Sequence, residues 1–465
     1  MFKKFHQRLN KVTEFEREPV PPSKQKGLRS FLGMYAGEHT AGTEFVIGPL
    51  FVVHGVTAFD LVVGLLVGNL LAVLSWAFIV SPIAVKERIT LYYKLEKICG
   101  KRLTAAYNLV NALMFCFLAG SMIAVSATAV GIPFGLPMPL LTDWFPSSVM
   151  WVIIVFGIGL ITTLVAMLGY DQVAKFANVA APWMILVFVG SAISVLPELG
   201  VNQLGDFWGV ANDKIWTGEV IEGQSKFTLW HVIFFSWFTN MAMHIGMGDM
   251  SILRYAKKWQ YGFSSAAGMF VGHYIAWLAS GILYAVFLHQ SQGSLEFAPG
   301  PIAYYAAGVA GAICVIIAGW TTANPTIYRA GLAIQGIFPR VKTWKVTLIV
   351  GLITTLAACF PALVMRLLEF VALYGLILMP MGAIIFADFY FYPRVGLISE
   401  WALHDKVPFN RAAGWTWLLT LGLCLAMSVF LGWEIYFLGL PGWFVAVGLY
   451  LALGKWMQSN RLAMT

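Results

Sequence analysis

The sequence predicts an all-α polytopic membrane protein of about twelve transmembrane helices. Hydrophobic residues make up 59% of its 465 residues and charged residues only 11%, whereas an ordinary soluble chain is roughly a quarter charged. The apolar residues also form uncharged runs, such as 61–79 and 303–328, which reach the ~20 residues that cross a bilayer as a helix. Because a bilayer offers backbone groups no water, such runs favour transmembrane helices over a soluble core.

Charged residues, prolines and glycines divide the apolar sequence into twelve predicted spans. The first five are 42–58, 60–82, 104–130, 148–168 and 173–197. The next five are 228–250, 261–288, 302–330, 346–361 and 363–388. Two further spans, 412–432 and 436–454, complete the set.

The positions of Lys and Arg predict the orientation of these spans. All but three of the 30 Lys and Arg residues lie in the tails or at even-numbered connections, and the exceptions are Lys214, Lys226 and Arg366. Since positive residues accumulate on the cytoplasmic side, we expect a multi-pass protein of the cell (inner) membrane with both termini cytoplasmic. The net charge of +8 then reflects topology, and no nucleic-acid partner is needed to explain it.

The predicted soluble parts are short. Residues 1–38 are basic, contain three prolines and have no apolar core, which predicts a cytosolic N-terminal tail. Residues 456–465 form a second cytosolic tail, and 39–455 form one transmembrane domain in contact with the lipid bilayer. The five cysteines are scattered and predict neither a disulfide framework nor a metal site.

Two predicted spans contain interruptions. The first span contains Gly48-Pro49, and the sixth contains two glycines within 244–249. In many transporters, helices broken at matching positions of two inverted repeats expose backbone groups that bind substrate and ions. The two positions match if 42–197 and 228–388 are five-span repeats followed by two extra helices at 412–454. For either interruption alone, the frequent use of Gly and Pro in membrane helices is an equally good explanation.

The eighth predicted span contains hydroxyl and amide side chains between residues 320 and 326. Polar groups deep in a span are costly unless they are satisfied. Hydroxyl and carbonyl oxygens suit a hard cation, so the cluster is a candidate Na⁺ site. The alternative is interhelical packing, with each hydroxyl bonded back to its own helix.

Four segments resemble the nucleobase–cation symporter family, the permeases for cytosine, purines, hydantoins and allantoin. Residues 380–390 are similar to the family's Pro-x-Gly…Asp-Tyr-Tyr ending of span ten, with Phe389 in place of the first Tyr. Residues 409–415 resemble the stretch that opens span eleven, with Arg411 in place of a Trp. Residues 68–71 and 320–324 resemble family segments in spans two and eight.

This resemblance implies the amino acid–polyamine–organocation superfamily fold, a five-plus-five inverted repeat with helices 1 and 6 broken and two C-terminal helices added. It implies transport by alternating access, coupled to Na⁺ or H⁺, with no other cofactor. Carried over to this sequence, the ion site would comprise Val46, Pro49, Ala318, Thr321 and Thr322.

The resemblance also implies a small-molecule site between the breaks of spans one and six. Its predicted residues are Gly48, Leu50, Phe115, Ala119, Trp237, Asn240, His244 and Asn324. The family holds a flat ring between two tryptophans, and here Phe115 and Asn240 take those places, with Trp237 one turn before Asn240. The implied solute is nitrogenous, such as a nucleobase or a related ring compound.

Other functions stay open at this point. The missing tryptophan pair keeps an amino-acid or amine transporter of the same fold as an alternative. A membrane-embedded enzyme lacks the expected motifs, because no His-Glu-x-x-His, Gly-x-Ser-x-Gly or phosphate-binding loop is present. A non-transporting sensor would normally need an output domain. Glu44, Asp249 and His273 are further candidates, since ionisable groups inside a membrane are often functional; the first two are expected near span ends. The oligomeric state is not predicted.

Overall fold

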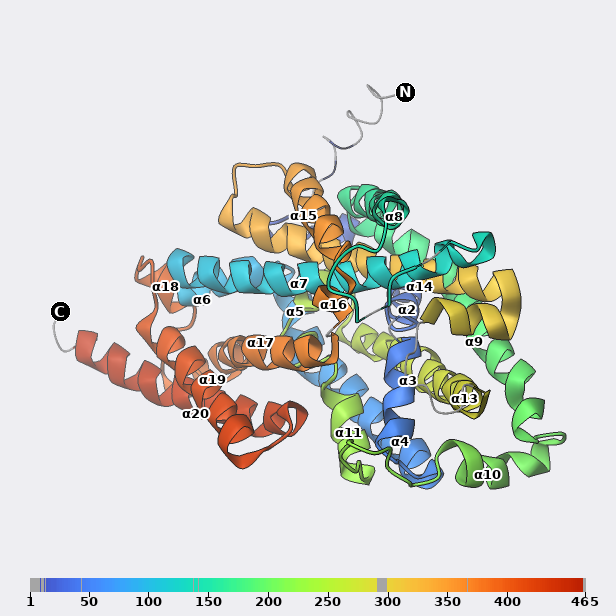
Figure 1. Ribbon diagram of the computed structural model, residues 1–465. Coiled ribbons are helices and arrows are strands. Elements are labelled where there is room, and N and C mark those ends of the chain that lie inside the picture. Colours follow the sequence, from blue (N-terminus) through green and yellow to red (C-terminus); the bar gives the residue numbers. More distant parts are fainter. Residues whose placement is uncertain are drawn as a thin grey trace.

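The computed structural model describes residues 9, 12, 14–42, 44–136, 138–140, 142–290, 299–365 and 367–462. Over these residues the chain is a bundle of helices (Figure 1), with two isolated bridges as its β-type pairings. Arg366, one of the three exceptions to the charge pattern, lies outside the described residues.

All twelve predicted spans have a counterpart among the described helices, nine of them long enough to cross a membrane and three shorter but apolar. Spans one to five are α2 and α3 (Leu28–Glu38, Glu44–Val53), α4 and α5 (Ala58–Ser75, Ser81–Glu87), α7 (Lys101–Val130), α8 (Val149–Met167) and α9 (Tyr170–Val195). Spans six to ten are α11 and α12 (Leu229–Phe238, Met250–Leu253), α13 (Ile275–Gln290), α14 (Pro299–Ile337), α15 (Thr343–Ala358) and α17 (Leu367–Tyr390). The last two are α19 (Arg411–Leu431) and α20 (Ile435–Leu462). The predicted all-α membrane fold is confirmed.

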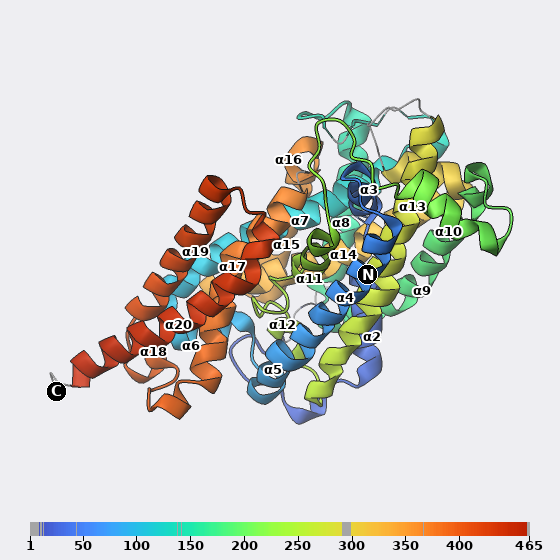
Figure 2. The same cartoon turned by 90° about the horizontal axis from the view of Figure 1, so that it is seen from below.

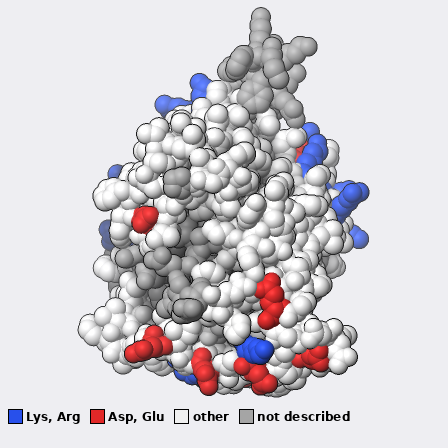
Figure 3. Space-filling view, turned by 45° about the vertical axis from the view of Figure 1, so that its right-hand side comes forward, with Lys and Arg blue, Asp and Glu red and all other residues white. Residues whose placement is uncertain are grey.

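The connections contain further short helices, α6 (Leu91–Cys99), α10 (Phe207–Val210), α16 (Pro361–Met365) and α18 (Trp401–His404). Within α14 the chain bends sharply at Ala307 and Gly308. On the face shown in Figure 3 most atoms are uncharged, and acidic groups gather along the lower edge. That distribution suits a molecule whose middle lies in lipid.

The two halves of the bundle pack in matching pairs. Helix α3 packs against α13, α11 packs against α4, and α7 and α8 pack against α14 and α15. Spans two and seven each contain a π-helical segment, Trp76–Val80 and Ala267–Tyr274. This pairing is expected if spans 1–5 and 6–10 are related repeats. Figure 2 shows α19 and α20 together at one side of the bundle, and both contact α17.

The break in span one lies earlier than the sequence predicted. Helix α2 ends at Glu38 and α3 begins at Glu44, so the chain leaves helical geometry between them, whereas Gly48 and Pro49 lie inside α3. A Cβ at Gly48 would collide with Ser280 of α13, so the glycine permits close helix packing. The prediction of a break at Gly48-Pro49 was therefore wrong.

The predicted tail boundary at residue 38 also needs correction. Helix α2 packs against α9 and buries Phe31, Met34 and Tyr35. These apolar residues recur at helical spacing, so 28–38 is a helix of the bundle and is grouped with α3 as span one. This helix is absent from the predicted spans because it is short and follows a basic, proline-containing stretch.

Residues of the family-like segments have identifiable structural roles. Gly68 allows α4 to approach α11, because a Cβ there would collide with the Ser236 hydroxyl. Asn410 is the N-cap of α19, where its side-chain oxygen accepts from the amides of Ala412 and Ala413. Asp388 accepts from the Glu400 amide at 3.1 Å. These segments therefore specify helix contacts and helix ends.

Candidate functional site

A cavity of about 70 Å³ lies where the interrupted parts of spans one and six meet. Its walls also include side chains from spans three, seven, eight and ten. The lining residues are Glu38, His39, Ala41, Glu44, Ile47, Leu118, Met122, Thr239, Asn240, Ala242, Met243, His273, Thr322 and Tyr374. The cavity is therefore enclosed by the two broken helices and by polar groups from both halves of the bundle.

The predicted break in span six is confirmed. Helix α11 ends at Phe238, helical structure resumes at Met250, and Met247 between them has a φ of +65°. The freed carbonyl of Ile245 accepts from the Trp443 indole of α20 at 3.3 Å. Gly382 of α17 lies directly against the same segment, because a Cβ there would collide with the Ile245 oxygen.

Replacing Gly382 with alanine is expected to destabilise the protein. The added methyl group must displace the backbone of the span-six break, and overpacking of this kind costs about 1–3 kcal/mol. Thermal unfolding of the purified variant should show a lower Tm. Gly422→Ala on α19 is the matched control, because no atom lies within 4 Å of its Cβ position. Equal Tm values for the two variants would contradict the close contact at Gly382.

A buried charge network joins the two broken spans to spans two and eight. Arg329 of α14 donates to both carboxylate oxygens of Glu38, at 3.0 Å for the longer contact, and to Asp249 at 2.7 Å. The second Asp249 oxygen accepts from the Trp76 indole at 2.6 Å and from the Tyr35 hydroxyl at 3.0 Å. Asp249 lies directly before α12 and is fully buried.

The predicted ion-site residues of span eight lie together beside the end of α2. The Thr322 hydroxyl donates to the Glu38 carbonyl at 2.9 Å and lies 3.4 Å from the Ala318 carbonyl. The Thr321 hydroxyl donates to Ala318 at 2.9 Å. Both hydroxyls thus bond back to the Ala318 carbonyl of their own helix, as in the packing alternative, and Thr322 also contacts the Glu38 carbonyl. Oxygen atoms of this kind suit a hard cation.

Solved structures of transporters share this architecture along almost the whole chain. Mhp1, a nucleobase-cation-symport-1 family transporter in a closed conformation with bromovinylhydantoin bound, matches with a TM-score of 0.71 at 17% identity, covering 96% of each chain. A Na⁺-coupled sialic acid symporter in a substrate-bound outward-open state matches with a TM-score of 0.66 at 15% identity, covering 98% of this chain and 96% of the other. This chain has the Mhp1 fold.

MhsT in complex with L-phenylalanine matches less closely, with a TM-score of 0.55 at 13% identity over 92% of this chain and 99% of the other. The sequence matches no protein-family model and no curated protein sequence. At these identities the structural matches establish the fold and not the solute. The fold implied by the family resemblance is confirmed.

Within the Mhp1 fold, the span-one residues predicted for the ion site need correction. Thr322 contacts the carbonyl of Glu38 at the end of α2, whereas Val46 and Pro49 lie inside the continuous helix α3. The reason is the earlier position of the break, since carbonyls within α3 are engaged in helical hydrogen bonds. Glu38 is therefore the span-one residue that Thr322 contacts.

Of the eight predicted substrate residues, Asn240 lines the cavity. Its side-chain amide nitrogen is buried and has no hydrogen-bond partner within the described part of the chain. Phe115 packs behind the wall, with its ring 5.3 Å from that of the lining residue Tyr374. Gly48, Leu50, Ala119 and Asn324 are not among the lining residues.

Two further predicted substrate residues point elsewhere. The Trp237 indole donates to Ser75 of α4 at 2.9 Å. His244 contacts the Trp237 carbonyl at 2.9 Å and meets the Trp76 ring edge-on. Its imidazole thus provides a hydrogen-bond partner for a carbonyl in the last turn of α11. Trp237 lies in the last turn of α11, whereas His244 lies in the unwound segment after Phe238. The helical spacing that would place both side chains on one face therefore does not extend to His244.

Sequence reasoning did not select Glu38, His39 and Tyr374 as site residues, although all three line the cavity. Glu38 is the last residue of the short helix α2, and the polar residues 39 and 40 directly follow it. That juxtaposition is the pattern that could have revealed the span-one break. Tyr374 lies in an apolar run and carries no comparable pattern.

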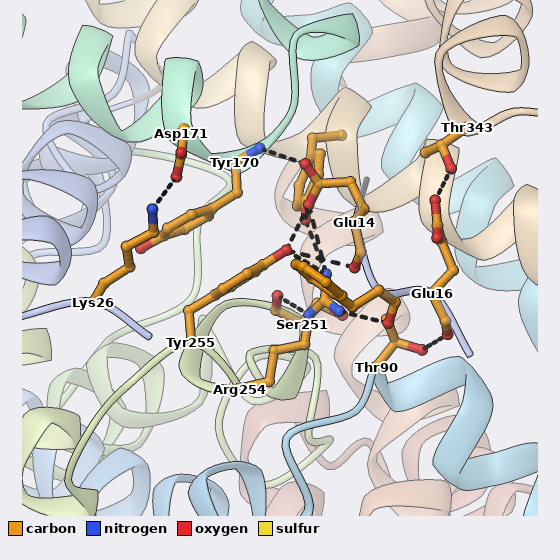
Figure 4. Close-up of polar contacts among 12 residues, drawn as sticks. Glu14, Glu16, Lys26, Thr90, Tyr170, Asp171, Ser251, Arg254, Tyr255 and Thr343 are labelled. Carbon is orange, nitrogen blue, oxygen red and sulfur yellow. Dashed lines mark hydrogen bonds and ion pairs between the residues drawn. The ribbon is translucent and has the colours of Figure 1, made fainter. Parts of the chain in front are cut away.

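The N-terminal segment is fastened to the bundle by a second buried cluster (Figure 4). Glu14 accepts from the hydroxyls of Tyr255 and Tyr328 at 2.8 and 2.6 Å and from the Tyr170 amide at 3.2 Å. Burial raises the pKa of Glu14, and the Arg254 guanidinium 3.6 Å away opposes that shift. Through Glu14 the N-terminal segment is thus packed against spans five and eight and the end of span six, instead of extending away as a free tail.

Proposed function

We propose that this protein is a cation-coupled secondary transporter that imports a small nitrogenous solute by alternating access. The observation that carries the proposal is the small cavity, lined by both polar and apolar side chains, between the broken helices of a symporter fold. We also propose that both termini lie in the cytoplasm. This membrane orientation puts nearly all Lys and Arg residues on the cytoplasmic side.

The cavity wall favours a solute with N–H donors. Carboxylates, imidazoles and the Asn240 amide line it, and no Lys or Arg side chain is among its described lining residues. An anionic solute would meet no Lys or Arg there, whereas a nucleobase or related ring offers N–H groups to the carboxylates and a ring carbonyl to the unpaired Asn240 amide nitrogen. An amine is the second candidate, because Glu44 has no Lys or Arg partner within the described residues.

The charge network supports a coupling cation beside Glu38. Glu38 and Asp249 share the single guanidinium of Arg329, so the fully ionised network has one excess negative charge. A cation held by the Glu38 carbonyl, Thr321 and Thr322 would compensate that charge in a buried setting. Na⁺ fits the oxygen ligands, and the sialic acid symporter of the same fold is Na⁺-coupled.

A thermal-shift screen tests the proposal. Purified protein is heated with uracil, cytosine, hydantoin, allantoin, single amino acids or simple amines, each with and without Na⁺. A ligand at 100 times its Kd stabilises the folded state by about 2.7 kcal/mol, so we expect one ring compound to raise the Tm in a Na⁺-dependent manner. A response to amino acids or amines alone would replace the ring-solute proposal by the second candidate.

Asn240→Ala is expected to change the ranking of solutes in uptake competition. Loss of a buried hydrogen-bonding group costs about 1–3 kcal/mol, which corresponds to about 5–150-fold in the affinity for solutes that use it. Phe115→Leu should preserve the ranking, since Phe115 contacts Tyr374 from behind the wall. If both variants change only the amount of folded protein, Asn240 does not contact the solute.

A further inference from the structure

Glu44 differs in its partners from three other carboxylates inside the bundle. Glu14, Glu38 and Asp249 each face an arginine. Glu44 lines the cavity at the start of α3 with 2% of its surface exposed. Its ion-pair contact in the described part of the chain is His273, with 3.6 Å between Nε2 and Oε1.

The surroundings of Glu44 hold this pair in place. Trp277 donates its indole N–H to the second Glu44 oxygen and stacks on the His273 ring with 4.4 Å between centroids. His273 Nδ1 is buried and has no hydrogen-bond partner among the described residues. The His273 ring also meets the His39 ring edge-on at 4.8 Å. Imidazole and carboxylate are thus held in ion-pair contact beside the cavity, slightly beyond direct hydrogen-bond distance.

His39 extends the set of proton-carrying groups. Its Nδ1 lies 2.8 Å from the Tyr35 carbonyl, so that nitrogen must carry the hydrogen and a neutral ring offers Nε2 as an acceptor. The other titratable or charged groups facing the cluster are Glu38 from α2, Tyr374 from α17 and, behind Glu38, Arg329 and Asp249. Trp76 of span two also contacts the His39 ring, and its indole does not titrate.

A buried carboxylate without a positive partner is strongly disfavoured. One proton removes the net charge of the Glu44–His273 pair, whether it resides on the carboxyl or on the imidazole. We propose that Glu44 and His273 form a proton-binding site that takes up one proton from external water with the solute and releases it to cytoplasmic water. This inference rests on the proposed transport function and places the proton apart from the Thr321–Thr322 cation site.

Proton binding by the purified protein is measured first, with the proton alone as the probe. Infrared difference spectra are recorded across a pH series for the wild type, Glu44→Gln and His273→Gln. A protonated-carboxyl band should titrate in the wild type, disappear in Glu44→Gln and change its midpoint in His273→Gln. The controls Glu434→Gln and His54→Gln alter an exposed acid and a partly exposed histidine at the ends of spans, and both should retain the band. A band unaffected by Glu44→Gln would overturn the proposal.

Coupling is then measured in proteoliposomes with radiolabelled uracil. An inward proton gradient should drive wild-type uptake of uracil. Glu44→Gln should lower that uptake about tenfold or more, because proton binding would no longer be coupled to solute binding. The same variant should still exchange labelled for unlabelled uracil without a gradient, which shows that it is folded and binds solute. Gradient-driven uptake at wild-type level in Glu44→Gln would overturn the proposal.

Failure of the transport proposal gives a different result. In that case neither the wild type nor Glu44→Gln moves uracil under any gradient, whereas the infrared titration still reports whether Glu44 binds the proton. Loss of the infrared band in Glu44→Gln would then support the proton site, and its persistence would overturn it.

Discussion

Arg329→Gln is expected to abolish solute uptake and to lower the free energy of unfolding by about 3–5 kcal/mol. The substitution leaves Glu38 and Asp249 buried and close together without the guanidinium that now contacts both. Because these carboxylates belong to the two broken spans and Arg329 to span eight, their repulsion would also displace the helices around the cavity. Thermal unfolding and uptake assays on the reconstituted protein measure the two effects.

Two further variants separate the loss of charge balance from the loss of geometry. Arg329→Lys keeps the positive charge but loses the planar fork that contacts two carboxylates, so it should recover part of the stability and little of the uptake. The triple variant Glu38→Gln, Asp249→Asn, Arg329→Gln removes every charge of the network and should be more stable than Arg329→Gln alone. If Arg329→Gln unfolds at the wild-type temperature, the buried network does not stabilise the fold.

Thr322→Ala is expected to abolish Na⁺-stimulated uptake and the Na⁺-dependent thermal shift. The Thr322 hydroxyl lies between the carbonyls of Glu38 and Ala318, so its removal deletes a ligand from the candidate ion site. Loss of even an outer-shell partner typically lowers metal affinity about 10–100-fold, and loss of a direct ligand should cost at least as much. Thr321→Ala should act in the same direction.

Thr326→Ala is the matched control for the ion site. Thr326 lies one turn further along α14, and its hydroxyl donates to the Thr322 carbonyl at 2.6 Å. It shares the helix, the burial and the chemistry of Thr322, but its hydroxyl donates within α14 instead of to Glu38. An unchanged Na⁺ dependence in Thr322→Ala, or an equal loss in Thr326→Ala, would contradict the assignment of Na⁺ to this position.

The sequence by itself determined the class of this protein and most of its helices. Length and polarity of a span are local properties, so composition and charge positions were sufficient to predict twelve spans. The break in span six was also local, because Gly246 and Gly248 mark it within the span. The cluster of Thr321 and Thr322 was visible in the same way, since both residues lie in one helix.

Only the tertiary structure decided where span one breaks and which side chains meet. Gly48-Pro49 looked like a break, yet packing against α13 keeps α3 helical there. Trp237 and Asn240 are close in sequence, and the unwinding after α11 turns one toward α4 and the other into the cavity. Arg329 lies 291 residues from Glu38 and 80 from Asp249. Contacts at such separations depend on how whole helices pack, which no local pattern in the sequence specifies.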